Sequence, residues 1–318
     1  MSELLIASQM GAEINQLLRE RLITLHPGAR VLDVATGVPS DLPPEVSVLL
    51  ARPINVRGFQ APDVPPPGWP YGLKWVQLSS SGIDFYPSWL FDGPQVTTAR
   101  GSASGPIAEF VLAAILAANK HLPDLWVHDD HWQHTALTPV EGQTLGILGF
   151  GSIGSSLAYK AQGLGMHVTA LRHSDTPFDV PGVRPAKDIH ELFAHADHLV
   201  IAAPLTEHTR HLVNAKVLDS AKPGLHLINI ARGGLLDQAA LLAALDSGRI
   251  GLASLDVTDP EPLPAGHPLY THPRVRLTPH TSAISTQGAA AIAGIVIDNL
   301  KRYLAGEPLT NRAGPTVS

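Results

Sequence analysis

The chain has 318 residues, of which 44% are hydrophobic and 16% charged, so it can bury a sizeable core and is not a disordered protein. Its formal net charge is −6, no run of basic residues occurs, and cysteine is absent. These features argue against a nucleic-acid or anionic-membrane partner, and they exclude disulfides, thiolate nucleophiles and cysteine-ligated metal centres. The length suffices for two domains of ordinary size.

The first hundred residues predict a small α/β unit. Buried strands are expected at residues 4–7, 30–35 and 46–50, with a helix over 9–25. After a proline-rich loop at 62–70, another strand at 73–78 ends in the segment Ser79-Ser-Ser-Gly-Ile-Asp84.

No signal peptide and no membrane span are expected. The N-terminus lacks a basic region followed by a long apolar stretch. The longest apolar run, residues 107–118, carries Glu109 and is too short to cross a bilayer. Together with the absence of cysteine, this favours a cytoplasmic protein.

The run Gly146-Ile-Leu-Gly149-Phe-Gly151-Ser-Ile-Gly154 is typical of a dinucleotide-binding turn. A short apolar strand at residues 144–148 precedes it, and apolar residues at helical spacing follow it. In such a turn Gly149 permits the tight bend, Gly151 lets the backbone approach a pyrophosphate, and Gly154 lets the helix pack against the strand. Free N–H groups at the helix start would hold the pyrophosphate.

Strands and helices alternate beyond this turn. Further strands are expected at residues 167–171, 197–202, 225–230, 251–255 and 275–277, and a terminal helix at 287–305. Because the glycine turn lies mid-chain, we expect a Rossmann dinucleotide-binding domain, residues 100–285, inserted into a smaller flavodoxin-like α/β substrate domain, residues 1–99 and 286–318. The two crossings would form a hinge, and a small ligand would bind in the cleft between the domains.

Three segments after the turn carry residues suited to catalysis. Arg232 follows a predicted strand, at the edge where open α/β sheets place ligands, and its guanidinium can hold a carboxylate through two hydrogen bonds. Two proline-flanked loops also follow strands, and they carry Asp256, Glu261 and His280. A histidine suits proton transfer to a carbonyl oxygen, and a neighbouring carboxylate would orient its ring.

The end of the second strand of the dinucleotide unit predicts which nicotinamide cofactor binds. NAD enzymes usually have Asp or Glu there for the ribose 2′-hydroxyl, but this chain has Arg172, followed by His173 and Ser174. Arg172 offers a 2′-phosphate a planar fork of donors, and Ser174 adds a hydroxyl. We therefore predict a preference for NADP(H), with NAD(H) possible. The alternative is that Arg172 stacks on the adenine and both cofactors bind.

The order and spacing of these motifs resemble those of the D-isomer-specific 2-hydroxyacid dehydrogenases, and the resemblance covers nearly the whole chain. It is carried by residues 73–84, 100–123, the glycine turn, Ala202-Ala-Pro-Leu-Thr206 with Thr209, the Arg232 segment, Glu261-Pro-Leu-Pro264 and Pro279-His280.

The resemblance implies reduction of a small 2-oxoacid, such as glyoxylate or hydroxypyruvate, to the D-2-hydroxyacid, and the prediction from Arg172 makes NADPH the expected cofactor. His280 would be the general acid in reduction and the base in oxidation, and Glu261 would pair with it. Arg232 would bind the substrate carboxylate and polarise the 2-oxo group. Backbone amides around Ser80, Ser81 and Gly82 would hold the carboxylate from the other domain. The implied cofactor contacts are Gly149, Gly151, Ser152, Ile153, Gly154, Arg172, His173, Ser174, Ala203, Pro204, Thr209, Ile230, Ala231, Ser282, Ala283 and, on the nicotinamide side, Asp256.

The histidine-rich segment at residues 128–134 has a simpler interpretation than its composition suggests. His128, His131 and His134 are spaced like metal ligands, but on a helix His134 would turn off the face of the other two, so we expect no metal site. This segment is better explained as an exposed arm, which in the resembled family helps to form a homodimer.

Candidate walls of the substrate pocket are Phe59, Phe85, Tyr86, Trp89 and Trp132.

Two alternative functions remain open on the sequence. One is a phosphite or formate dehydrogenase of the same fold, although related formate enzymes have Gln where Glu261 stands. The other is a nucleotide-sensing binding protein like the transcriptional corepressors of this superfamily, against which the complete set of Arg232, Glu261 and His280 argues.

Overall fold

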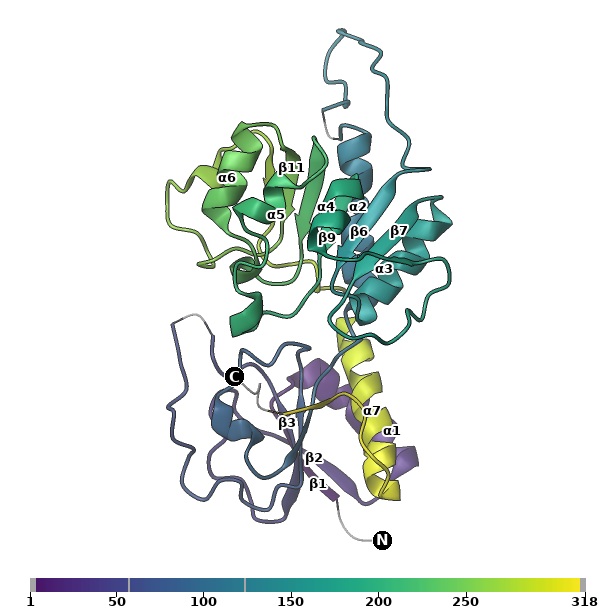
Figure 1. Ribbon diagram of the computed structural model, residues 1–318. Helices are drawn as coiled ribbons and strands as arrows, with labels where there is room; N and C mark the ends of the chain where they lie inside the picture. Colours follow the sequence, from purple (N-terminus) through teal and green to yellow (C-terminus); the bar gives the residue numbers. More distant parts are fainter. Residues whose placement is uncertain (1–3, 57, 123, 315–318) are drawn as a thin grey trace. The chain divides into compact units, whose positions relative to one another are not determined.

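The computed structural model describes residues 4–56, 58–122 and 124–314, which form two compact units (Figure 1). The first unit comprises the chain up to Ala103 and again from Ser285, and the second comprises Ser104–Ile284. Each unit is built around one sheet. Within the described residues, no helix is both long and apolar enough to cross a membrane.

The first unit is a flavodoxin-like sheet with strand order β13-β5-β4-β3-β1-β2, in which β13 is antiparallel to β5 and the other neighbours are parallel. Its strands are β1 (Leu4–Ser8), β2 (Ala29–Asp33), β3 (Val46–Ala51), β4 (Trp75–Leu78), β5 (Gln95–Thr97) and β13 (Arg312–Ala313). Helices α1 (Ala12–Leu25) and α7 (Gly288–Ala305) pack side by side (Figure 1).

The two faces of this sheet bury different side chains, because neighbouring residues of a strand point to opposite faces. Val48 and Leu50 of β3 pack in one core with α1 and α7. Leu49 and Ala51 belong to the other core, which loop residues and the short 3-10 helix η1 (Ser88–Phe91) cover.

The second unit is a Rossmann sheet of parallel strands in the order β12-β11-β10-β9-β6-β7-β8. The strands are β6 (Thr144–Leu148), β7 (His167–Leu171), β8 (Arg184–Pro185), β9 (His198–Ile201), β10 (Leu225–Asn229), β11 (Ile250–Leu255) and β12 (Val275–Leu277). The strand order reverses between β6 and β9, and ligands of such sheets bind at this switch point, outside the carboxyl ends of the strands.

Helices complete the second unit. They are α2 (Ser104–Asn119), α3 (Ser152–Gly163), α4 (Ile189–His195), α5 (Ala215–Asp219) and α6 (Gln238–Asp246). Helix α2 packs against α3, and the ion pair of Lys160 with Glu109 (2.9 Å) joins the two helices. Between α2 and β6, residues 124–143 contain neither helix nor strand and run out from the body of this unit (Figure 1).

The predicted fold class is confirmed, and the ends of several helices and strands differ from the predicted ends by a few residues. The helix expected from residue 9 begins at Ala12, because Gly11 takes a positive φ of 89° that is not helical, and the chain turns there between β1 and α1. The strand expected to reach residue 35 ends at Asp33. The short strands β5, β8 and β13 were not predicted, because two or three residues show no periodicity.

Candidate active site

The predicted site residues of the second unit lie at the carboxyl ends of neighbouring strands. The glycine turn follows β6, Ala203 follows β9, Arg232 follows β10 and Asp256 follows β11. His280 follows β12. Because these strands are parallel and adjacent, their loops meet at one edge of the sheet.

The glycine turn has the geometry that a pyrophosphate needs. Gly149 takes a left-handed φ of 95°, and a Cβ at this position would lie 2.5 Å from the backbone nitrogen of Ala203. Only glycine therefore lets the turn pass so close to the loop after β9. Helix α3 has no side-chain cap. None of the hydrogen bonds between described residues uses the N–H groups of Ser152, Ile153 or Gly154. The residues present thus fit a dinucleotide phosphate at this helix end.

The loop after β7 is held against the glycine turn by aromatic contacts. Phe178 packs edge-on to Phe150 of the turn, with ring centroids 4.7 Å apart. The guanidinium of Arg172 lies 5.1 Å from the centre of the Phe178 ring. One of its terminal nitrogens donates to the carbonyl oxygens of Thr176 and Pro177, whereas its buried Nε has no hydrogen-bond partner. His173 and Ser174 are exposed beside it.

The loop after β9 carries the predicted contacts Ala203, Pro204 and Thr209. The Oγ1 of Thr209 donates to the carbonyl of Pro204 (2.8 Å), and Thr206 and Thr209 cap each other across the short 3-10 helix η2 (Glu207–Thr209). This hydroxyl therefore shapes the loop through contacts within the protein.

Arg232 stands in a tight turn after β10. Buried Asn229 holds this turn, because its side chain accepts from the N–H of Ala231 (3.1 Å) and donates to the carbonyl of Arg232 (3.0 Å). The next residue is Gly233, where an added Cβ would lie 2.0 Å from the carbonyl carbon of Thr258. Gly233 thus brings the Arg232 turn against the loop that leads to Glu261. Sequence reasoning did not assign a role to Asn229 or Gly233, although the pattern Asn-Ile-Ala-Arg-Gly contained both.

Asp256 joins the ends of three strands. Its backbone N–H donates to Asn229 (3.0 Å), and its carboxylate accepts from the hydroxyl of Thr278 (2.6 Å) and the N–H groups of Thr281 and Ser282 (both 2.9 Å). Burial raises the pKa of Asp256, but the hydrogen bonds from Ser282 and Thr278 outweigh it and hold that pKa below the usual value. Asp256 therefore remains ionised and positions the loop on which His280 stands.

His280 and Glu261 form a hydrogen-bonded pair. The Nδ1 of His280 lies 3.0 Å from one carboxylate oxygen of Glu261 and 3.1 Å from the other. His280 takes a left-handed φ of 50°, and its N–H donates to the carbonyl of Asp256 (2.9 Å). This strained backbone is fixed by the Asp256 contacts, as is common at functional sites. With Nδ1 on the carboxylate, Nε2 is the ring nitrogen left for a substrate.

The other predicted substrate contacts belong to the first unit. Ser80, Ser81 and Gly82 form a turn directly after β4, here called the 80–82 turn. Ser81 is exposed, and none of the described hydrogen bonds uses the N–H of Ser81 or Gly82. Two of the predicted pocket walls are wrong, because Tyr86 and Trp89 are 5% and 3% exposed and lie in the core behind this turn.

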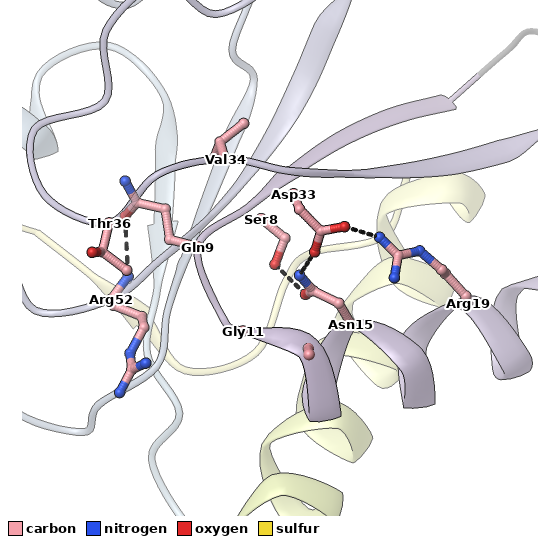
Figure 2. Close-up of a pocket in the computed structure, with 10 residues that line it drawn as sticks. Ser8, Gln9, Gly11, Asn15, Arg19, Asp33, Val34, Thr36 and Arg52 are labelled. Atoms are coloured by element: carbon pink, nitrogen blue, oxygen red, sulfur yellow. Dashed lines mark hydrogen bonds and ion pairs between the residues drawn. The ribbon is translucent and has the colours of Figure 1, made fainter.

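A pocket of about 350 Å³ lies at the carboxyl ends of β1, β2 and β3 of the first unit (Figure 2). Figure 2 shows a chain of side chains that joins α1 to this edge: Ser8 and Asp33 both bond to Asn15, and Arg19 pairs with Asp33. Hydrogen bonds from Asn15 and Arg19 lower the pKa of Asp33. No residue of this pocket was predicted from sequence, because the chain of contacts spans three separate elements.

The histidine-rich segment is irregular rather than helical. Among the described residues, Asp129, Asp130 and His131 bring potential ligand atoms within 4.8 Å of one another, and all three are exposed. Exposed carboxylates gather in this way on many surfaces without binding a metal.

Comparison with known proteins agrees with this geometry. The NAD binding domain of the D-isomer specific 2-hydroxyacid dehydrogenases matches residues 112–282. The chain is 37% identical to glycerate dehydrogenase of Methylorubrum extorquens over 250 residues, 74% of this chain and 77% of that protein. Its match to D-3-phosphoglycerate dehydrogenase of Bacillus subtilis is 36% identical but spans only 39% of that protein's length. A solved D-isomer specific 2-hydroxyacid dehydrogenase from Xanthobacter autotrophicus Py2, in complex with NADPH and MES, is 29% identical, with a TM-score of 0.81 over 99% of both chains.

The order of the parallel sheet and the glycine turn at its switch point define a dinucleotide-binding protein of the Rossmann class. The match over the whole of that sheet is more specific: the chain belongs to the D-isomer specific 2-hydroxyacid dehydrogenase family, as the resemblance of its motifs predicted.

Proposed function

We propose that this protein is an NADPH-dependent reductase that converts a small 2-oxoacid to the D-2-hydroxyacid. The observation that carries the proposal is the bond between His280 and Glu261, at 3.0 Å, at the sheet edge that also holds the Arg232 turn. The first unit would bind the substrate and the second unit the cofactor.

His280 would supply the proton of the reaction. Glu261 accepts the hydrogen bond from Nδ1 and stabilises the imidazolium, so Nε2–H is directed toward the substrate. This proton passes to the 2-oxo oxygen as the carbonyl becomes an alkoxide, and neutral His280 takes a proton back when the hydroxyacid is oxidised. The nicotinamide, when bound, supplies or accepts the hydride at C2.

Each unit offers groups that suit a carboxylate. In the second unit the guanidinium of Arg232 matches a carboxylate in shape and charge, and it would also stabilise negative charge on the 2-oxo oxygen. In the first unit the N–H groups of Ser81 and Gly82 are donors without partners among the described hydrogen bonds, so they suit a carboxylate too.

The direct test is a substrate panel. Purified protein is assayed by absorbance of the reduced cofactor with glyoxylate, hydroxypyruvate, pyruvate and oxaloacetate, each with NADPH and with NADH. We expect turnover of at least one small 2-oxoacid, with the D-hydroxyacid as product. Tight NADPH binding without turnover of any 2-oxoacid contradicts the proposal. Oxidation of phosphite with NADP⁺ in a parallel assay would instead identify the protein as a phosphite dehydrogenase.

Arg172 supports the NADP(H) preference. The position directly after β7 is occupied by Arg172 rather than by a carboxylate, and a guanidinium matches a 2′-phosphate in charge and shape. The solved relative from Xanthobacter autotrophicus contains NADPH.

We expect Arg172→Asp to lower the ratio of kcat/KM for NADPH over NADH at least tenfold, and to weaken binding of 2′,5′-ADP in calorimetry. Exposed Lys187→Asp is the matched control and should change neither value. An unchanged ratio in Arg172→Asp contradicts this role and favours stacking on the adenine.

We also propose a homodimer formed through the second unit and its extended arm, residues 124–143. The support is that side chains which usually lie in a core are exposed there, Trp126 at 63% and Trp132 at 80%.

A further inference from the structure

A buried tyrosine, Tyr86, lies behind the 80–82 turn, and no catalytic role was predicted for it. The carbonyl of Ser80 accepts from the N–H of Ala99 (3.0 Å), and the N–H of Ser79 donates to the carbonyl of Ala51 (2.9 Å). These two bonds tie the base of the turn to neighbouring chain segments, but neither fixes its tip at Ser81 and Gly82. The tip is where a carboxylate would bind.

The side chain of Ser80 closes the turn on itself. Its Oγ lies 2.7 Å from the carbonyl oxygen of Gly82 and 3.2 Å from the Oη of Tyr86. A serine hydroxyl has one proton, and the shorter contact is to the carbonyl, which can only accept. The Ser80 hydroxyl therefore donates to Gly82.

The oxygen of Tyr86 is the second acceptor of the Ser80 hydroxyl, at the longer distance. Tyr86 in turn donates toward the carbonyl of Ala51, 3.5 Å away and at the limit of a hydrogen bond. The Ser80 hydroxyl therefore lies between the carbonyl of Gly82 and the oxygen of Tyr86, and these two acceptors fix its position.

The position of Tyr86 suits a fixed support. Tyr86 is 5% exposed and packs in the core on the face of the sheet that loops and η1 cover. Burial raises the pKa of Tyr86, against hydrogen bonds from Ser80 and Ser79 that lower it, so the hydroxyl remains a proton donor. Its ring cannot move without disturbing that core, and the hydroxyl is held in one place.

We propose that Tyr86 is a positioning residue for substrate binding: through the hydroxyl of Ser80 it holds the 80–82 turn with the N–H groups of its tip directed outward. The proposal rests on the proposed function of this turn as the carboxylate site. Because the turn would bind the carboxylate equally in the ground state and the transition state, its loosening should raise KM and leave kcat unchanged.

The test is Tyr86→Phe, which removes one oxygen and keeps the ring. We expect KM for the best 2-oxoacid to rise about fivefold, the loss of one ordinary hydrogen bond, with kcat within twofold of wild type. The inhibition constant of oxamate, a non-reducible carboxylate, should rise by the same factor, while NADPH affinity stays unchanged. Tyr71→Phe is the matched control in the same unit, because its hydroxyl lies 3.3 Å from the carbonyl of Pro39, away from the turn, and it should change none of these values.

The variant Ser80→Ala, alone and combined with Tyr86→Phe, tests whether Tyr86 acts through Ser80 or through a general effect on packing. If Tyr86 acts through Ser80, the double variant has the KM of Ser80→Ala alone, whereas independent effects would multiply. An unchanged KM in Tyr86→Phe, multiplying effects, or a fall in kcat instead of a rise in KM overturns the proposal. Wild-type protein that reduces no 2-oxoacid and binds no oxamate contradicts the carboxylate site itself. Normal wild-type kinetics with an unaltered Tyr86→Phe variant overturns only the role of Tyr86.

Discussion

At the scale of single residues, the proposed role of His280 depends on the hydrogen bond between its Nδ1 and Glu261, because this bond sets the orientation of the ring. The carboxylate faces Nδ1 with both oxygens, at 3.0 and 3.1 Å. Glu261→Gln keeps the shape and the hydrogen-bond acceptor but removes the charge. We expect kcat for 2-oxoacid reduction to fall about 100-fold, in the range of general acid–base catalysis, with little change in the KM for NADPH.

Steady-state kinetics of Glu261→Gln beside Glu141→Gln checks this prediction, because Glu141 is exposed and lies outside the site. A kcat within threefold of wild type in Glu261→Gln would show that the pair is structural.

A second histidine pair lies inside the Rossmann sheet. The Nδ1 atoms of His198 and His226 are 3.0 Å apart, and their Nε2 atoms contact Gln143 Oε1 (2.8 Å) and Ser254 Oγ (2.9 Å). Gln143 Oε1 can only accept, so His198 carries its proton on Nε2. His226 must then donate through Nδ1, and the hydroxyl of Ser254 donates to its other nitrogen. Both rings are neutral in this arrangement, and protonating either one removes an acceptor.

This pair makes the free energy of unfolding depend on pH. Burial lowers the pKa of His198 to about 4, against the attraction of Asp197, and lowers the pKa of His226 to about 3. An unfolded histidine has a pKa of about 6.5. Between these values only the unfolded chain binds the protons, so stability is complete above about pH 6.5 and falls as the pH drops toward 4, by at most about 2.7 kcal/mol per pH unit for the two groups.

Urea unfolding at pH 7.5, 6 and 5 measures this slope. We expect His226→Gln to reduce it by about half, whereas the exposed His131→Gln should follow the wild type. A wild-type stability that is constant from pH 7.5 to 5 contradicts the assignment.

The sequence indicated the residues with charges or hydroxyls next to strand ends, and it missed the residues that hold them. Arg232, Glu261 and His280 were predicted because their residue types and order are specific. Asn229 and Thr278 were not, because their role depends on contacts with Ala231 and Asp256 that no sequence spacing encodes. Tyr86 was predicted to line the substrate pocket but lies in the core. The sequence could not distinguish the two, because an aromatic residue suits a pocket wall and a core equally well.

At the scale of elements, the glycine turn between β6 and α3 is set by steric contact with a neighbouring loop. A methyl group at position 149 would lie 2.5–2.7 Å from backbone atoms of Ala202 and Ala203, at a φ that side chains rarely adopt. Gly149→Ala should therefore lower thermal stability and weaken NADPH binding at least tenfold, as measured by differential scanning calorimetry and fluorescence titration.

Gly163, at the far end of the same helix, is the matched control. A Cβ there meets nothing within 4 Å. Gly163→Ala should leave NADPH binding unchanged and stabilise the protein by up to about 1 kcal/mol, because alanine loses less backbone entropy in a helix. Equal behaviour of the two variants would mean that the turn tolerates a side chain.

The elements that periodicity could identify were predicted well, and the shortest ones were missed. Strands such as β6 and β10 are buried on both faces, so they appear in the sequence as apolar runs. Strand β13 consists of Arg312 and Ala313, and only its pairing with Val96 and Thr97 of β5 makes it a strand.

At the scale of the whole molecule, the extended arm of the second unit should control the oligomeric state. Large apolar side chains exposed on a segment without helix or strand are typical of a protein interface. We expect the wild-type protein to be a dimer at micromolar concentration and Trp126→Ser/Trp132→Ser to be a monomer, as measured by analytical ultracentrifugation. Ile23→Ser removes an apolar side chain of similar exposure, 70%, from α1 of the first unit and should leave the dimer intact. A monomeric wild type, or a dimer that survives the double substitution, contradicts this role of the arm.

The amino-acid sequence by itself determined the fold class, the place of the dinucleotide turn and the residue types that would carry the chemistry. These follow from local rules, because glycine spacing, strand hydrophobicity and the position of a polar residue after a strand are properties of short segments. The family resemblance implied that Glu261 pairs with His280, and the structure gives the geometry of that pair. Only the tertiary structure decided that Asp256 ties three strand ends together and that Tyr86 lies behind the 80–82 turn. The Asp256 contacts form only once the sheet has brought the strand ends together, and Tyr86 takes its place only once its ring packs in the core.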